Sequence, residues 1–164
     1  EATEYFRIEE WTYSYGTHAA HVAVDAETGL IEILHYVVAE DVGRCINPLL
    51  THGQSVGGAA QGIGGTILEE LVYDSGGQLL AGTFMDYLLP TSRDIPPIDS
   101  IILEEAPSPL NPLGAKGAGE GAILATGATL ANAVSDALAD FGVNVTELPL
   151  SPDNIKRWIR ESHP

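Results

Sequence analysis

The stretch GQSVGGAAQGIGGTILEEL, residues 53–71, decides the fold, and its apolar character and length predict a helix over Gly53–Leu71. Six glycines fall within its first thirteen residues. Glycine costs about 1 kcal/mol relative to alanine at an interior helix position, so the helix carries a large local penalty. We therefore expect another element or a ligand to approach its backbone closely.

The sequence before this helix predicts β-structure. Its pattern indicates three strands, at residues 4–15, His18–Asp25 and Leu30–Ala39. The stretch Asp25-Ala26-Glu27-Thr28-Gly29 reads as a turn that joins the last two strands into a hairpin, with Gly29 at positive φ. Residues 41–52 then form a predicted loop.

The sequence after the helix predicts further strands and helices around a loop rich in Pro and Gly. We expect extended segments at 79–90 and 99–105, the loop at 106–119, a helix over Ala122–Ala139, and a last helix that starts near Ser151. The mixture predicts an α+β fold, with antiparallel strands and a few packed helices, and a single domain over residues 1–164.

Composition excludes several classes of function. The chain has 164 residues, 45% of them hydrophobic, and a net charge of −16, which disfavours binding to nucleic acid or anionic membranes. Its single cysteine, Cys45, excludes internal disulfides, iron–sulfur ligation and four-cysteine zinc sites. No His-Glu-x-x-His spacing occurs, so we predict no protein-ligated metal. No serine sits in a Gly-x-Ser-x-Gly elbow, so a serine nucleophile of that kind is not indicated.

Three stretches are conspicuous, and the second and third leave structural and functional interpretations open. DVGRCINP at 41–48 is typical of a strand exit followed by a turn. GQSVGGAAQGIG at 53–64 fits a glycine-rich helix packed on a sheet. It also fits a helix start whose free N–H groups face a polar ligand, with Gln54 offering both a donor and an acceptor.

The third stretch is GAKGAGEGA at 114–122, in which Glu120 stands among glycines just before an apolar helix. A glutamate there can simply favour the helix dipole. It can also be a carboxylate held where the backbone lets a ligand approach. Neither a Walker A loop nor a dinucleotide-binding GxGxxG motif is present.

In this order and at this spacing, the stretches resemble the C-terminal part of the molybdenum-cofactor-binding large subunit of the molybdenum hydroxylases. That family includes xanthine dehydrogenase, aldehyde oxidase and the large chain of aerobic carbon monoxide dehydrogenase. The resemblance runs from about Tyr15 to Trp158. It rests on the three stretches above together with DAETG at 25–29, LEE at 68–70, GTFMDYLLPT at 82–91 and NAV at 132–134.

The resemblance implies a role for each matching residue. Glu120 corresponds to the catalytic base and Gln54 to the glutamine that binds the pterin of the cofactor. Neighbouring cofactor contacts are expected at Gly53, Lys116, Gly117, Ala118 and Gly119. The cofactor is molybdenum–molybdopterin in a dinucleotide form. The implied enzyme is cytoplasmic, hydroxylates a small substrate with water-derived oxygen, and passes electrons to iron–sulfur and FAD subunits or domains.

The family's large subunit is several times longer than this chain. We therefore expect this chain to be either a fragment or a separately encoded piece of a split subunit, with the upstream half of the large subunit as its partner. We also expect the isolated chain to be inactive and free of molybdenum. Two alternatives stay open: a non-catalytic scaffold or assembly module that keeps the fold, and an unrelated acid–base enzyme that uses Glu120. The second needs another carboxylate, and the spacing places none beside Glu120.

Overall fold

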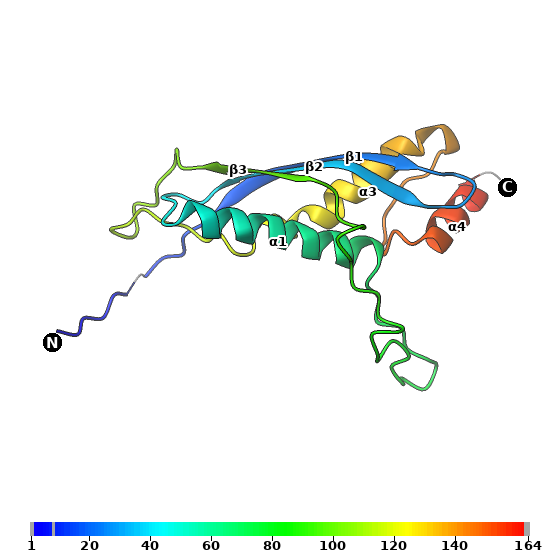
Figure 1. The fold of residues 1–164 in the computed structure, drawn as a ribbon, viewed down its shortest axis with the longest axis horizontal. Coiled ribbons are helices and arrows are strands. Elements are labelled where there is room, and N and C mark those ends of the chain that lie inside the picture. Colours follow the sequence, from blue (N-terminus) through cyan, green and yellow to red (C-terminus); the bar gives the residue numbers. More distant parts are fainter. Residues whose placement is uncertain (1, 8, 163–164) are drawn as a thin grey trace.

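A three-stranded sheet covered on one face by helices forms the body of the molecule (Figure 1). The computed structural model describes residues 2–7 and 9–162. The strands are β1 (Tyr15–Val24), β2 (Ile31–Asp41) and β3 (Ile98–Leu103), in the spatial order β1–β2–β3. This arrangement confirms the predicted α+β class.

The β1–β2 hairpin forms as predicted from its turn. β1 pairs antiparallel with β2, and Gly29 adopts a φ of 78°, in the left-handed region that favours glycine. The Asp25 carboxylate accepts hydrogen bonds from the backbone N–H groups of Glu27 and Thr28, which stabilises the turn.

The second strand pair differs from the antiparallel expectation, because β3 runs parallel to β2. A parallel pair needs a long crossover connection, commonly a helix. Helix α1 (Pro48–Ile67) lies in the connection between β2 and β3. The sheet is therefore mixed.

The strand predicted at residues 4–15 is wrong, and the extended segment expected at 79–90 forms no strand. The described residues between 4 and 14 form no strand, and residue 8 lies outside the described part of the chain. Tyr5 and Trp11 in this segment are 87% and 81% exposed, so the segment does not pack against the body of the molecule. Residues 79–90 contain turns and a single bridge between Tyr73 and Leu79 instead of a strand.

Helix α1 begins earlier than predicted. Asn47 is its N-cap, its side chain accepts a hydrogen bond from Leu50 N at 3.3 Å, and Pro48 occupies the first helical position. Gly53 is therefore an interior helix residue. The expectation that a helix start at Gly53 presents free N–H groups to a ligand is wrong, because those groups already bond within the helix.

The glycines of α1 let a second helical segment approach its backbone. A Cβ at Gly58 would lie 3.1 Å from Ala122 Cβ, and a Cβ at Gly62 would lie 2.6 Å from Thr126 Cβ. Real Cβ atoms essentially never lie within 3.0 Å of such an atom, so the contact with Thr126 requires glycine at position 62. The close approach predicted from the glycine content is thus confirmed at these two positions.

The helix predicted over 122–139 is interrupted. It consists of α2 (Gly121–Leu124) and α3 (Thr126–Ala137), and the short 3₁₀ helix η1 (Ala139–Phe141) follows. The last helix, α4 (Pro152–Ser162), starts as predicted. The Ser151 hydroxyl accepts a hydrogen bond from Asn154 N at 3.4 Å.

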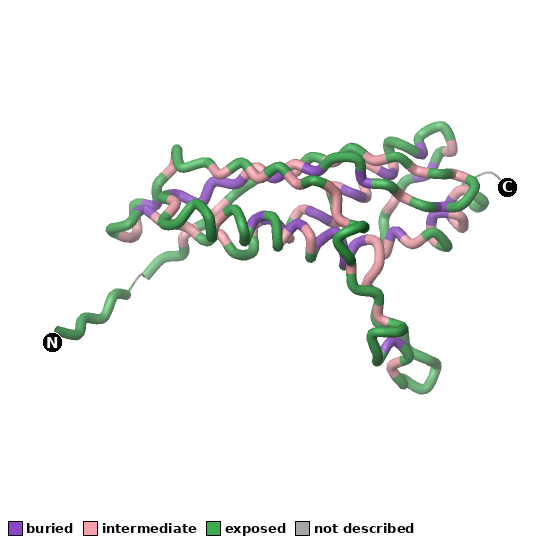
Figure 2. The backbone as a smooth tube through the Cα atoms, viewed as in Figure 1, coloured by how far each residue is buried: buried purple, intermediate pink, exposed green. Residues whose placement is uncertain are grey.

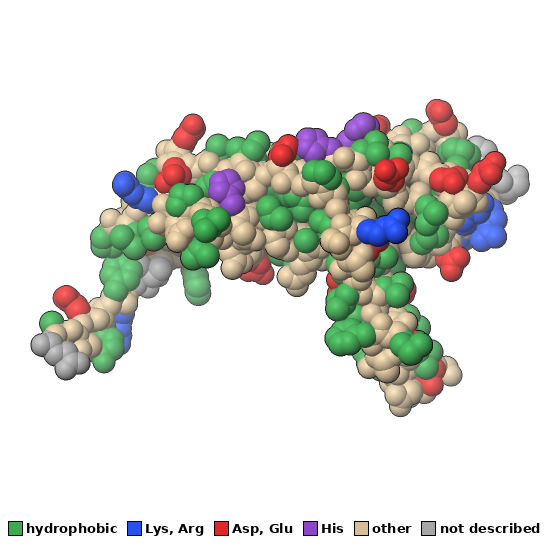
Figure 3. Space-filling model, in the orientation of Figure 1, with side chains coloured by type: hydrophobic (Ala, Val, Ile, Leu, Met, Phe, Trp, Pro, Cys, Tyr) green, Lys and Arg blue, Asp and Glu red, His purple; other side chains and the backbone are tan. Residues whose placement is uncertain are grey.

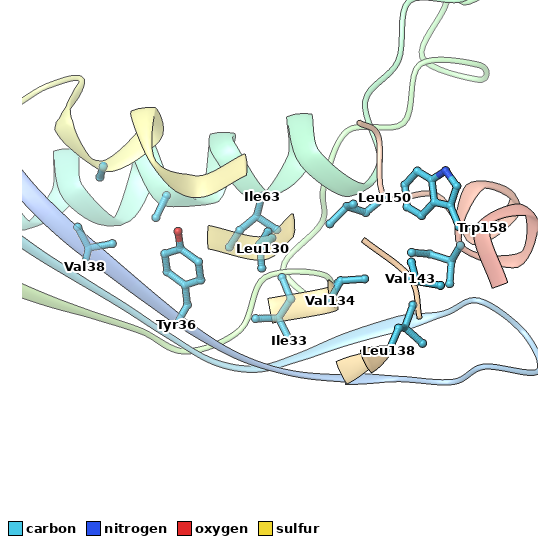
Figure 4. Packing of buried hydrophobic residues seen from close by; sticks show 13 residues of the cluster. Ile33, Tyr36, Val38, Ile63, Leu130, Val134, Leu138, Val143, Leu150 and Trp158 are labelled. Atoms are coloured by element: carbon cyan, nitrogen blue, oxygen red, sulfur yellow. The ribbon is translucent and has the colours of Figure 1, made fainter. Parts of the chain in front are cut away.

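The hydrophobic core lies between the sheet and the helices (Figures 2 and 4). Tyr36 and Val38 of β2 meet Ile63 of α1 and Leu130 of α3 there, and all four are fully buried. α4 seals one end of this core through buried residues that include Ile155.

An arm of irregular structure projects from the body between α1 and β3 (Figure 1). The hydroxyl of Tyr87 donates a hydrogen bond of 2.5 Å to Glu69 at the base of the arm. Phe84 and Met85 are 83% and 90% exposed, and apolar side chains cover much of the arm surface (Figure 3).

Candidate functional site

The loop that precedes α2 carries Glu120, and its own side chains fix its path. Asn111 accepts a hydrogen bond from Ala115 N at 3.1 Å and donates one to Ala115 O at 2.8 Å. Gly114 has a φ of 70°, which favours glycine. An isolated bridge between Gly43 and Ala115 then fastens the loop to the end of β2.

Lys116 and Asp41 form a buried ion pair at the start of the glycine-rich part of this loop. The ammonium lies 3.0 Å from Asp41 Oδ1, and the side chains are 8% and 2% exposed. Burial alone would raise the pKa of Asp41. Hydrogen bonds from Gly43 N and from the Lys116 ammonium outweigh that effect and hold the pKa below its usual value.

The ion pair gives Lys116 a structural task that the sequence did not predict. Its ammonium also lies 4.7 Å from the centroid of the Tyr15 ring, a cation–π contact. Its backbone N–H donates to Val42 O at 2.8 Å. The predicted cofactor contact of Lys116 stays a prediction, and in this structure the ammonium is buried against Asp41.

Gln54 lies beside the loop. It is exposed on α1, and its Oε1 lies 3.9 Å from the position that a Cβ would take at Gly119. Within the described part of the chain, a Cβ at Gly53 or at Gly57 would have no atom within 4 Å. The glycines next to Gln54 therefore leave an open surface over this turn of α1.

The backbone from Gly117 to Gly119 offers hydrogen-bond donors at this surface. Within residues 2–7 and 9–162, the N–H groups of Gly117, Ala118 and Gly119 donate to no protein acceptor. Gly117 and Gly119 are exposed. Consecutive free N–H groups of this kind can hold a polar or anionic ligand.

Glu120 follows these donors directly. It occupies the N-cap position of α2 with φ −106° and ψ −16°, and its side chain makes no capping hydrogen bond. Its carboxylate is exposed. A capping role would need that missing hydrogen bond. The geometry therefore gives no support to Glu120 as a helix cap and leaves its carboxylate free to meet a ligand.

A polar cluster behind Glu120 was missed by sequence reasoning. It comprises His18, Tyr36, Glu40 and the backbone of Gly121. His18 Nδ1 lies 2.9 Å from the Tyr36 hydroxyl. Burial lowers the pKa of His18, while the Glu40 carboxylate and a hydrogen bond to the Gly121 backbone oppose that shift.

A cavity of about 240 Å³ adjoins this cluster. Its walls include His18, Glu40, Gly121 and Leu124. The available signal was the pair of acids that ends the apolar run of β2, Glu40 and Asp41. Charged residues are almost never buried without a partner, so two of them at a strand end indicate a specific environment.

The stretch DVGRCINP proves structural in the described chain. Gly43 takes a φ of 62°, and Asn47 caps α1. Cys45 Sγ lies 3.2 Å from Thr51 Oγ1, which gives that thiol a local partner. Among residues 2–7 and 9–162, no three His, Cys, Asp or Glu side chains are arranged to hold a metal ion.

No helix in residues 2–7 and 9–162 combines the length and apolar character needed to cross a membrane. The longest helix, α1, carries Gln54 and Gln61 within its span.

Comparisons with known proteins identify relatives of this chain. Residues 1–96 match the molybdopterin cofactor-binding domain family. The chain is 46% identical over 143 residues to the 6-hydroxypseudooxynicotine dehydrogenase complex subunit gamma of Paenarthrobacter nicotinovorans, covering 87% of this chain and 18% of that protein. It is 32% identical over 163 residues to the carbon monoxide dehydrogenase large chain of Hydrogenophaga pseudoflava, covering 98% of this chain and 20% of that one.

The fold has a close counterpart among solved structures. Quinoline 2-oxidoreductase from Pseudomonas putida 86 superposes with a TM-score of 0.85 at 46% identity, over 89% of this chain and 18% of that chain. The chain thus spans about a fifth of the length of the proteins that it matches.

Proposed function

This chain belongs to the molybdopterin cofactor-binding domain family, and from that premise we propose that it forms one wall of the active site of a molybdenum hydroxylase. The family membership confirms the resemblance drawn from the sequence motifs. We infer that Glu120 is the catalytic base of that enzyme. Gln54 and the Gly117–Gly119 backbone would hold the cofactor.

One observation carries the proposal. The exposed side chain of Gln54 lies beside Gly119 in a run of free backbone N–H groups, and the exposed Glu120 follows that run directly, although Gln54 and Glu120 are far apart in the sequence. The Gly58–Ala122 and Gly62–Thr126 contacts between α1 and the α2–α3 segment bring them together.

These residues suit a large polar cofactor. Gln54 can both donate to and accept from the edge of a pterin ring, as heterocycle recognition requires. The N–H groups of Gly117, Ala118 and Gly119 can donate to oxygen atoms of the bound group. Because glycines flank Gln54 and the loop, no side chain would block close approach of the cofactor to the backbone.

The bound molybdenum cofactor would supply the oxidation chemistry, and Glu120 would handle the proton. Its exposed carboxylate can accept a proton from an oxygen nucleophile as that oxygen attacks the substrate carbon. The carboxylate can then release the proton to solvent before the next turnover. Gly119 and Gly121 on either side keep side chains away from the approaching substrate.

The partners of the assembled enzyme are part of the proposal. We expect the upstream half of the large subunit to close the other side of the cofactor, and iron–sulfur and FAD subunits or domains to accept the electrons. We further propose a dinucleotide form of the cofactor and a cytoplasmic location. Several matched relatives are named as subunits or chains of larger enzymes.

The decisive experiment is Glu120→Gln in the assembled enzyme, with molybdenum content measured in the same preparation. Gln is nearly isosteric with Glu, so the loop and the bound cofactor should persist while the base is lost. We expect kcat to fall by about 10²- to 10⁴-fold, the usual contribution of a general base.

Glu105→Gln is the matched control. Glu105 is an exposed glutamate that lies in the same connection between β3 and α2, and kcat should stay at the parent value. A Glu120→Gln enzyme that carries its molybdenum and turns over within a few-fold of the parent would overturn the assignment. It would favour the non-catalytic scaffold instead.

A further inference from the structure

Glu40 is the most unusual polar side chain outside the proposed site. It lies near the end of β2 and is only 3% exposed. Among the described residues its Oε2 has no hydrogen-bond partner. An unpaired buried carboxyl oxygen is costly, so its retention at this place requires an explanation.

Glu40 lies against the residue that follows Glu120. A Cβ built at Gly121 would overlap Glu40 Oε1 and would lie 3.2 Å from Glu40 Cδ. The Glu40 carboxyl group therefore occupies the space that any side chain at position 121 would need. A Cβ built at Gly16, its neighbour on β1, would lie 2.6 Å from Ala39 O and 3.3 Å from Glu40 Cγ.

Glu40 and Asp41 hold the two ends of the loop that carries Glu120. Asp41 forms the buried ion pair with Lys116 at one end. Glu40 contacts Gly121 at the other end. Between these two points the loop makes few contacts of its own: a Cβ at Gly117 or Gly119 would meet only one atom within 4 Å.

We propose that Glu40 is a positioning residue for Glu120, and that Gly121 is its matched partner. The Glu40 carboxyl group sets the distance between the Gly121 backbone and β2. It thereby fixes the direction in which the Glu120 side chain points from the loop. This inference rests on the proposed role of Glu120 as the base. It concerns packing and geometry, and it does not require Glu40 to contact the substrate or the cofactor.

The cavity beside Glu40 makes the proposal testable. A methyl group at position 121 would push the Glu40 carboxyl group toward this space, which His18 and Leu124 also line. The carboxyl group and the turn that carries Glu120 would have to move apart, and the proposal predicts that part of this movement shifts Glu120. A displacement of about 1 Å near the reacting atoms can cost about 100-fold in rate, so even a small shift is measurable.

The experiment is a double-mutant cycle in the assembled enzyme with Glu40→Ala, Gly121→Ala and the combination of both. Molybdenum content, the thermal midpoint of unfolding, KM and kcat are measured for each. We expect each single variant to lower kcat by about 10- to 100-fold at nearly unchanged KM. In the double variant the new methyl group occupies space that the carboxyl group has vacated, so kcat should exceed that of either single variant.

Two further variants complete the design. Glu40→Gln keeps the volume of the side chain against Gly121, and we expect its kcat to stay within a few-fold of the parent. Glu32→Ala removes an exposed glutamate from the same strand and should leave kcat unchanged. Glu40→Gln also keeps the test informative if Glu40→Ala fails to fold.

The outcomes separate the two claims. Losses of kcat that multiply in the double variant, or lowered thermal midpoints with parental kcat per molybdenum, would overturn the positioning role. Full turnover of Glu120→Gln would instead overturn the proposed function. In that case the packing match between Glu40 and Gly121 would still be visible in the thermal midpoints of the cycle.

Discussion

The Lys116 ammonium and Asp41 Oδ1 lie 3.0 Å apart in a pair that solvent hardly reaches, although the two residues are 75 positions apart in the chain. Asp41 also accepts hydrogen bonds from Gly43 N at 2.8 Å and Ala106 N at 3.2 Å. One carboxylate thus ties the end of β2 to both the beginning and the end of the long loop that leads to Glu120.

Replacing Lys116 by Met should destabilise the protein strongly. Met keeps the length of the side chain but leaves the Asp41 carboxylate buried without its cation. Breaking a buried ion pair by removing one partner typically costs about 3–5 kcal/mol. The two backbone hydrogen bonds to Asp41 keep part of the charge satisfied, so we expect a loss near the lower end, measured by urea unfolding at pH 7.

Arg44→Met serves as the matched control, because Arg44 is exposed and close to the same loop. Surface substitutions of this kind usually change the free energy of unfolding by less than about 0.5 kcal/mol. Equal unfolding free energies for the two variants would contradict the structural role of the ion pair.

The sequence predicted those parts of the fold that local signals encode. Asp25 and Gly29 specify the hairpin turn, and both the turn and the two strands form. The glycines at 58 and 62 predicted a closely packed neighbour, and α2 and α3 are that neighbour. Such signals depend on φ preferences and side-chain size at single positions, which a sequence displays directly.

The errors occurred where structure depends on a distant partner. Residues 4–15 and 79–90 have strand-like composition, yet a strand forms only by pairing with another, and in the described chain residues 4–14 and 79–90 join no sheet. The parallel pairing of β3 was inferable from a helix between two strands, but composition alone did not select it.

The site residues also divide into those that the local sequence predicts and those that depend on a distant partner. The position of Glu120 just before a helix and of Gln54 on a helix could be read from the sequence. The Lys116–Asp41 pair and the packing of Glu40 on Gly121 could not, because each joins segments that only the folded chain brings together. The early start of α1 was encoded by Asn47-Pro48 and was misread as loop.

The stability of the protein should fall as the pH drops below the ordinary pKa of histidine, partly through His18. Burial holds the pKa of His18 below its unfolded value of 6.5, so the unfolded chain binds more protons than the folded chain in this window. The contribution of His18 is therefore fully present above pH 6.5 and is lost as the pH falls toward the lowered folded pKa. Urea unfolding at pH 7.5 and 5.5 measures the change.

His18→Gln should flatten this pH dependence, since Gln does not titrate. His21→Gln removes an exposed histidine from the same strand and is the matched control. Some carboxylates have a lowered pKa, among them Asp25, Asp94 and Glu147. The stability that they contribute is lost only as the pH falls below their ordinary pKa values of 3.8 for Asp and 4.5 for Glu. An unchanged slope in His18→Gln would show that His18 does not contribute.

The purified 164-residue chain should hold molybdenum at far below stoichiometric amounts. Gln54 and Glu120 are exposed, and the glycines beside Gln54 face open surface, so this chain can contact a cofactor from one side only. Binding sites for large polar groups normally enclose most of the ligand surface. Contacts from a single side leave little free energy after the cost of immobilising the ligand.

Elemental analysis of the purified chain measures its molybdenum content, and circular dichroism verifies in the same sample that the chain is folded. The assembled enzyme is the positive control and should carry stoichiometric metal. The chain spans about 18% of a matched relative. Under the proposed function, the remaining contacts come from the upstream half of the large subunit. Stoichiometric molybdenum in the folded, isolated chain would contradict this expectation. It would mean that the α1 glycines and the Gly117–Gly119 amides suffice to hold the cofactor.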